Sequence, residues 1–101
     1  MKCNCCTKNN IKKIDSSIEV LKAVSDSNRI RILCLLRREK ICVCDIGRKL
    51  DMAQNLVSFH LKILYEASIL GKRREGKCIY YFIRQSWKKR INYIFRFLEI
   101  I

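Results

Sequence analysis

Apolar residues in the first two thirds of the chain recur at intervals of three and four, a spacing typical of amphipathic helices. Residues 16–19 (SSIE) fit a capping box, in which a serine and a glutamate three positions later satisfy the free N–H groups of a helix start. We therefore predict a first helix from about Ser16 and a second after Asp26. A third helix from about 42 to 50 and a fourth from about 53 to 65 are separated by a short turn, which is helix-turn-helix spacing.

After Ala67 the pattern changes to alternation. Residues 69–74 and 77–83 flank Glu75-Gly76, which predicts two strands joined by a tight turn. Helical spacing returns in the final segment, residues 86–101. Its apolar stripe consists of Trp87, Ile91, Ile94, Phe95, Leu98 and Ile101, widened by Tyr93, Phe97 and Ile100. A face this broad exceeds what a small domain covers, so we expect it to pack against a second copy.

The predicted fold is mainly α with a small β hairpin, in the order α-α-α-α-β-β-α. This is a winged helix-turn-helix, and we expect it to form a homodimer. A single DNA-binding domain over residues 1–101 would carry a flexible N-terminal arm, about 1–13, and a dimerisation helix, about 86–101. The arm contains Cys3, Cys5 and Cys6.

Charge and cysteine content narrow the function. The 22 Lys and Arg residues exceed the 9 Asp and Glu residues, and the resulting net charge of +13 points to a polyanionic partner. The seven cysteines are an odd number, which argues against a closed disulfide framework. The start of the chain has no signal-peptide pattern, and no apolar run is long enough for a membrane span. We therefore expect a cytoplasmic protein with reduced thiols, in which cysteine clusters bind metal.

The cysteine pair in Ile41-Cys42-Val43-Cys44-Asp45 stands where the third helix should begin. A thiol is a weak acceptor and a poor helix cap, so these cysteines suggest a soft metal ion. On a regular helix, residues i and i+2 point about 200° apart. Cys42 and Cys44 can therefore share one ion only if the first turn is frayed or deformed. Two thiolates are also too few for one ion, because As(III) takes three sulfurs and Cd(II), Pb(II) or Zn(II) take three or four.

Three further segments resemble the ArsR/SmtB family of metal-responsive repressors. Residues 21–33 (LKAVSDSNRIRIL) are similar to the family's second-helix signature, and residues 57–64 (VSFHLKIL) to its recognition helix. Residues 73–77 (RREGK), followed by Tyr80-Tyr81, match the family wing. The cysteine pair resembles the metal box of the arsenic, cadmium and lead sensors. The chain departs from the pattern at Gly47, where arsenic sensors often have a third cysteine.

The resemblance implies a repressor that binds DNA without metal and is released by As(III) or by Cd(II), Pb(II) or Zn(II). It implies Cys42 and Cys44 as metal ligands, with the arm supplying the others, either Cys3 or Cys5 together with Cys6. Cys34 is interpreted as a small core residue. Cys78, in the wing, is expected to lie far from the box.

The predicted fourth helix has Val57, Leu61 and Leu64 on its inward stripe. The residues left for the DNA groove are Gln54, Asn55, Ser58, Phe59 and Lys62. His60 has either a DNA-facing or a packing role. The basic residues at the predicted hairpin tip, Arg73, Arg74 and Lys77, suit phosphates or a narrow minor groove. A symmetric dimer implies a pseudo-palindromic double-stranded operator.

Other functions fit the sequence less well. A thiol redox switch, with a disulfide between the box and the arm, is the alternative within the DNA-binding class. A thiol oxidoreductase would show C-x-x-C, whereas this chain has C-x-C and no acid–base companion, so we predict no enzyme. A membrane-surface module would need an amphipathic helix rich in Lys and Arg. The predicted recognition helix lacks this pattern, so we expect no membrane partner.

Overall fold

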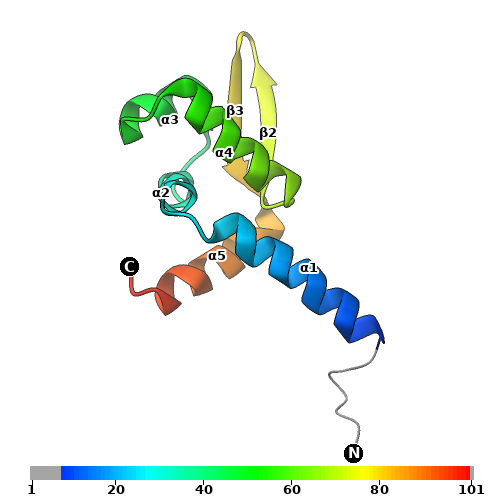
Figure 1. The fold of residues 1–101 in the computed structure, drawn as a ribbon. Coiled ribbons are helices and arrows are strands. Elements are labelled where there is room, and N and C mark those ends of the chain that lie inside the picture. The colour runs from blue at the N-terminus through cyan, green and yellow to red at the C-terminus, as the bar shows by residue number, and fades with distance from the viewer. Residues whose placement is uncertain (1–7, 101) are drawn as a thin grey trace, which may run out of the picture.

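The computed structural model describes residues 8–100, which form five helices and a three-stranded antiparallel sheet (Figure 1). The elements are α1 (Lys8–Val24), α2 (Ser27–Leu36), β1 (Ile41–Cys42), α3 (Val43–Leu50), α4 (Gln54–Glu66), β2 (Leu70–Glu75), β3 (Cys78–Ile83) and α5 (Gln85–Phe97). The hairpin of β2 and β3 projects from one end of the molecule beside α4, and α1 and α5 lie at the other end. The predicted winged helix-turn-helix is confirmed.

The first helix starts earlier than the sequence pattern predicted. α1 begins at Lys8, so the capping box at Ser16 is wrong, and the predicted arm of residues 1–13 includes helical residues. The hydroxyls of Ser16 and Ser17 instead donate to the carbonyl oxygens of Lys12 and Lys13, at 3.1 and 2.8 Å. A serine inside a helix satisfies its hydroxyl in this way, on the carbonyl four residues back.

The start of the second helix agrees with the prediction. Asp26 has extended backbone angles, φ −153° and ψ 135°, and its carboxylate accepts a hydrogen bond from the backbone N–H of Arg29 at 3.1 Å. This N-cap bond satisfies one of the free donors at the start of α2. It also holds the pKa of Asp26 below its ordinary value.

One apolar core joins the helices to the sheet. Its fully buried side chains are Ile32 and Leu33 of α2, Ile46 of α3, Val57, Leu61 and Leu64 of α4, Ile69 and Leu70 at the start of the hairpin, and Ile91 and Phe95 of α5. The inward stripe predicted for α4 is therefore correct. Arg37 lies 4.8 Å from the centre of the Phe95 ring, and its Nε donates to Asn92 Oδ1 at 3.1 Å, which fastens α5 to the end of α2.

The sheet contains a strand that hydrophobic periodicity did not reveal. β1 has only two residues and pairs with β3, with Ile41 opposite Tyr81 and Cys42 opposite Tyr80. The hairpin turn also lies one residue later than predicted, because Glu75 pairs with Cys78 and leaves Gly76 and Lys77 as the loop. Gly76 has a φ of +63°, which glycine adopts without the strain that a Cβ causes.

The last helix uses only part of its apolar surface inside the protomer. α5 ends at Phe97, four residues short of the predicted end. Ile91 and Phe95 are fully buried in the core, whereas Tyr93 and Phe97 are 58% and 85% exposed. The broad face predicted from the sequence is thus divided between the core and an open surface.

Candidate functional site

Cys42 and Cys44, called the cysteine box below, lie where β1 ends and α3 begins. Cys42 is the N-cap of α3 and has an extended backbone, φ −69° and ψ 144°, with no hydrogen bond from its side chain to the helix. Its Sγ lies 3.3 Å from Sγ of Cys44. Because Cys42 precedes the helix, the two thiols converge without any deformation of α3. The prediction that the first turn must be frayed or deformed assumed that both cysteines lie in the helix, whereas Cys42 lies just before it.

This separation suits a soft ion. Zinc–sulfur bonds of about 2.3 Å in tetrahedral geometry place two sulfurs about 3.8 Å apart, within a few tenths of an ångström of the observed distance. Cys42 is buried and Cys44 is exposed, so an ion can approach from the Cys44 side. The donor set is thiol sulfur, which selects thiophilic ions over magnesium or calcium.

The electrostatics of the box favour a thiolate at Cys42. The hydrogen bond with the Cys44 thiol holds the pKa of Cys42 below its ordinary value, against the opposing effect of burial. The same interaction with Cys42 raises the pKa of Cys44. Since a thiolate is the form that binds metal, Cys42 is the first ligand available to an incoming ion.

Cys78 lies beside the box, which corrects the expectation that it would be remote. Cys42 is paired with Tyr80, and Cys78 is two residues before Tyr80 on β3, so both cysteines point to the same face of the sheet. The thiol of Cys78 is a hydrogen-bonding partner of Cys42, and this interaction raises the pKa of Cys78. This neighbour could not be found from residue spacing, because its position depends on the pairing of the two-residue strand β1 with β3.

The remaining cysteines do not join this group in the part of the chain that the structure describes. Cys34, interpreted from the sequence as a core residue, is exposed on α2. Cys3, Cys5 and Cys6 lie outside the described residues. Among residues 8–100, no three Cys, His, Asp or Glu side chains are already arranged to hold a metal ion.

Position 47, the third cysteine position of arsenic sensors, cannot easily hold a larger side chain in this fold. A Cβ on Gly47 would lie 3.0 Å from the carbonyl oxygen of Met52 and 3.6 Å from Cγ2 of Val57. The backbone N–H of Met52 also donates to the Gly47 carbonyl at 2.9 Å. The turn from α3 to α4 is thus closed tightly over Gly47.

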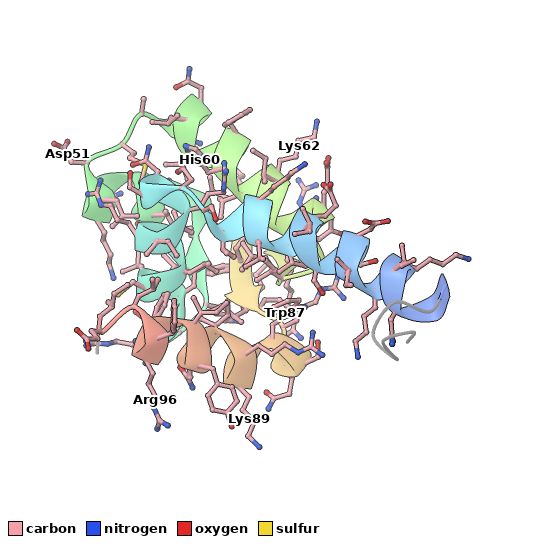
Figure 2. The ribbon with its side chains drawn as sticks, turned by 60° about the horizontal axis from the view of Figure 1, so that its bottom comes forward. Asp51, His60, Lys62, Trp87, Lys89 and Arg96 are labelled. Atoms are coloured by element: carbon pink, nitrogen blue, oxygen red, sulfur yellow. The ribbon has the colours of Figure 1, made fainter. Side chains whose placement is uncertain are left out.

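The helix α4 presents a polar face at the same end of the molecule as the wing. Gln54, Asn55, Ser58 and Lys62 are exposed, and Phe59 is 56% exposed. Lys62 lies on the side opposite Trp87, Lys89 and Arg96 of α5 (Figure 2). The five exposed side chains of α4, namely Gln54, Asn55, Ser58, Phe59 and Lys62, remain predicted DNA contacts.

His60 differs from its neighbours on α4 because it is 95% buried. Its Nδ1 lies 3.1 Å from a guanidinium nitrogen of Arg29 and 3.9 Å from the carboxylate of Asp26, and its Nε2 lies 3.5 Å from the Asn28 side-chain amide. These contacts fasten the recognition helix to the start of α2. The structure therefore favours the packing role for His60, and we remove it from the predicted DNA contacts.

The predicted basic side chains of the wing are not all at its tip: Lys77 is in the loop, whereas Arg73 is opposite Tyr80, two pairs before the last pair of the hairpin, and lines the cavity described below. Arg73, Arg74 and Lys77 are all exposed, and the Nε of Arg74 donates to the Gly76 carbonyl at 3.4 Å. Lys40, next to the box, forms an ion pair with Glu75 and lies 5.1 Å from the centre of the Tyr80 ring. The loop before β1 is thereby joined to the wing.

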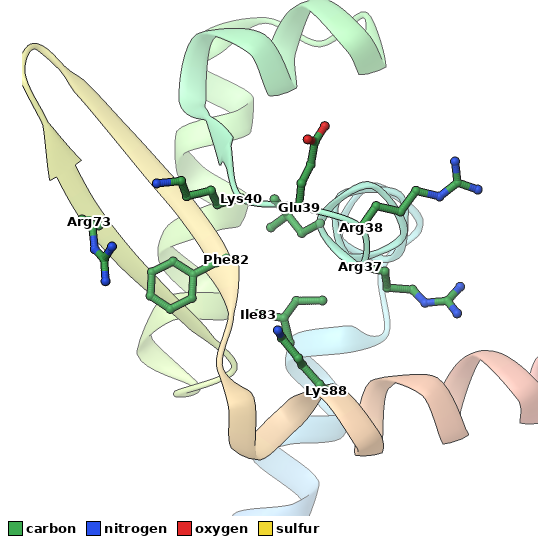
Figure 3. A pocket seen from close by; sticks show the side chains of 9 residues that line it. Arg37, Arg38, Glu39, Lys40, Arg73, Phe82, Ile83 and Lys88 are labelled. Carbon is green, nitrogen blue, oxygen red and sulfur yellow. The ribbon is translucent and has the colours of Figure 1, made fainter.

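A basic cavity of about 280 Å³ lies between the end of α2, the hairpin and α5 (Figure 3). Its lining includes five basic residues and one acidic residue, namely Arg37, Arg38, Lys40, Arg73, Lys88 and Glu39. Phe82 forms one wall, and its ring covers Gly71 so closely that a Cβ there would lie 2.5 Å away. The lining has no Cys, Ser, Thr or His.

Comparisons with known proteins agree with this architecture. Residues 26–72 match the model for "Bacterial regulatory protein, arsR family". The chain is 37% identical over 82 residues to the uncharacterized HTH-type transcriptional regulator MJ1325 of Methanocaldococcus jannaschii, which covers 80% of this chain and 92% of that protein. It is 41% identical over 63 residues to the arsenic resistance transcriptional regulator ArsR1 of Pseudomonas putida, covering 61% of this chain and 49% of that protein.

The chain spans about half the length of the cadmium and arsenic resistance regulators that it matches. Among solved structures, the homodimeric winged helix-turn-helix DNA-binding domain Mb0332 of Mycobacterium bovis superimposes with a TM-score of 0.85 at 23% identity, covering 92% of this chain and 87% of that one. Within the described residues, no helix has the length and apolar character needed to cross a membrane. The chain belongs to the ArsR/SmtB family of winged helix-turn-helix transcriptional regulators, which bind DNA and are not enzymes.

Proposed function

We propose that this protein is a homodimeric repressor that leaves its operator when a thiophilic ion binds at Cys42 and Cys44. The observation that carries the proposal is the convergence of these two thiols, 3.3 Å apart, at the first turn of the helix-turn-helix. Relatives named for arsenic and cadmium resistance make As(III) and Cd(II) the first ions to test.

DNA binding is assigned to α4 and the wing. The side chains of Gln54 and Asn55 can pair with adenine edges in the major groove, and the Phe59 ring can contact a thymine methyl group. The wing-tip cations can neutralise phosphates or enter a narrow minor groove. The exposure of all these residues supports the assignment.

A second copy of the chain is the proposed partner at the other end of the molecule. A groove of about 570 Å³ lies between the end of α1, the start of α2 and α5, and its apolar lining includes Leu21, Ile30, Tyr93, Phe97 and Leu98. Along α1, the apolar residues Ile11, Ile14 and Ile18 are also 43–50% exposed. Exposed apolar surface of this extent marks an interface, and the similar domain Mb0332 was solved as a homodimer.

Release from DNA requires that the ion bind the DNA-free conformation more tightly than the DNA-bound one. The box is suited to this coupling because α3 continues through the closed turn at Gly47 and Met52 into α4. A further ligand drawn onto the same ion would pull on the start of α3, and the recognition helix would follow that movement. The two recognition helices of the dimer would then no longer match two half-sites.

The test compares Cys42→Ser and Cys44→Ser with the control Cys34→Ser, whose exposed thiol lies outside the box. Each reduced full-length variant is titrated with sodium arsenite on a fluorescent duplex that the wild-type chain has selected from a random library. We expect normal duplex binding for all three variants, because serine is small and caps a helix start well. Only Cys34→Ser should dissociate at the wild-type arsenite concentration. Normal release of Cys42→Ser or Cys44→Ser would refute the proposal.

A further inference from the structure

We propose that Cys78 of the wing supplies the third sulfur of a three-thiolate As(III) site, together with Cys42 and Cys44 of the same protomer. The inference rests on the proposed function, which assigns Cys42 and Cys44 as ligands but leaves the third donor open. As(III) needs three sulfurs in a pyramid, and the box provides two.

The sheet register places Cys78 within reach. Cys42 is opposite Tyr80 in the antiparallel pair of β1 and β3, so Cys78 is the diagonal neighbour of Cys42 on the same face. Diagonal neighbours in such a pair have Cα atoms about 7–8 Å apart, and their side chains can meet. Interaction with the Cys42 thiol also raises the pKa of Cys78, in agreement with this proximity. The register thus brings Cys78 to the side of Cys42, whose sulfur already lies 3.3 Å from that of Cys44, and a shift of the Cys78 side chain would bring a third sulfur to one ion.

Alternative third donors in the described part of the chain are less suitable. Gly47 has no side chain, and a Cβ there would press against the Met52 carbonyl. Cys34 is exposed on α2, and no interaction links it to the box. Asp45 is in the first turn of α3, but a carboxylate is a hard ligand and suits As(III) less well than a thiolate.

The chemistry of the site is ligand exchange without redox change. Each of the three thiols replaces one hydroxyl group of arsenous acid, and its proton leaves with that hydroxyl as water. Arsenic stays in the trivalent state, and the protein forms three As–S bonds.

A ligand from the wing would change what the ion does to DNA binding. Cys78 is the first residue after the wing loop, and Arg74 and Lys77 lie within a few positions of it. An ion held by Cys42, Cys44 and Cys78 would tie the wing to the start of α3. The two elements that contact DNA would then move as one unit, and each would lose its freedom to fit the duplex.

The test measures sulfur coordination in the reduced full-length chain loaded with one equivalent of sodium arsenite. Arsenic K-edge X-ray absorption should give three sulfurs for the wild type, for Cys34→Ser and for a chain with Cys3, Cys5 and Cys6 all changed to Ser. Cys78→Ser should give two sulfurs and one oxygen. The arsenite needed to release it from the selected duplex should rise by at least tenfold, since even loss of an outer partner of a metal ligand costs about 10- to 100-fold.

A second measurement uses only the wild-type chain and so does not depend on a variant that folds. Arsenite should protect Cys42, Cys44 and Cys78 from alkylation by iodoacetamide, while Cys34 reacts at its usual rate, as read by mass spectrometry. Protection of Cys42 and Cys44 without Cys78, or three sulfurs retained in Cys78→Ser, would overturn the inference and leave the proposed function intact. Absence of protection at Cys42 and Cys44 would overturn both.

Discussion

Removal of one wing arginine should change both the strength and the salt dependence of DNA binding. Arg74 is exposed near the tip of the hairpin, and its guanidinium is held towards the loop by a hydrogen bond to the Gly76 carbonyl at 3.4 Å. In a symmetric dimer, Arg74→Ala removes two such groups from the surface that we propose to contact the DNA backbone. The substitution should leave the fold intact because the side chain is outside the core.

The magnitude follows from counterion release. Each phosphate neutralised contributes about 0.9 to the slope of log K against log salt, so two lost contacts should flatten the slope by roughly 1.8. Between 50 and 200 mM salt this amounts to about a tenfold change in the affinity ratio of wild type to variant. The deficit of Arg74→Ala should therefore be largest at low salt and shrink as salt is added. A monomer on DNA would lose only about half of this slope.

The assay is fluorescence anisotropy of the selected duplex at four or more salt concentrations. The matched control is Lys89→Ala, which removes the same charge from an exposed residue on the side of the molecule opposite Lys62 (Figure 2). Lys89→Ala should keep the wild-type slope. An unchanged slope for Arg74→Ala would remove the wing from the contact surface. Equal flattening in both variants would show that the slope reports overall charge rather than local contacts.

Three further predictions concern assembly and stability. Phe97→Glu, at a side chain 85% exposed in the protomer, should keep native circular dichroism but sediment as a monomer; a stable dimer would place the interface elsewhere. Asp26→Ala should lower the free energy of unfolding by about 1 kcal/mol at pH 7 through loss of the N-cap bond. Because the folded-state pKa of Asp26 is lowered, urea denaturation should show this difference vanishing as the pH falls through that pKa. Gly47→Ala should lower the Tm, because its Cβ would lie 3.0 Å from the Met52 carbonyl; an unchanged or higher Tm would mean that the turn relaxes freely.

The sequence predicted those parts of the fold that depend on local periodicity. The helices α2, α3 and α4 and both wing strands lie within two residues of their predicted bounds, because their apolar stripes face one core. The start of α1 was misplaced because Ser16 and Glu19 form a local cap pattern, whereas the apolar stripe continues upstream through Ile11 and Ile14. Outside a packed core, local signals do not determine where a helix begins.

The site was less predictable than the fold, because its geometry depends on pairing between distant segments. The cysteine box could be found from residue type alone, but the convergence of Cys42 and Cys44 results from the extended backbone at Cys42. That backbone conformation comes from the pairing of β1 with β3. A strand of two residues is too short to be recognised from its sequence pattern. The same pairing brings in Cys78. The burial of His60 likewise depends on Arg29 and Asp26, some thirty positions earlier in the chain.

The two-residue strand β1 therefore links sensing to DNA binding in physical terms. It is antiparallel to β3 of the wing and leads directly into α3, which the closed turn at Gly47 joins to α4. Any change in the position of Cys42 must either break the pairing with Tyr80 or move the wing with it. Because a ladder hydrogen bond contributes only about 1 kcal/mol, whereas metal–thiolate binding can supply about 10 kcal/mol or more, an ion at the box has enough free energy to rearrange this junction.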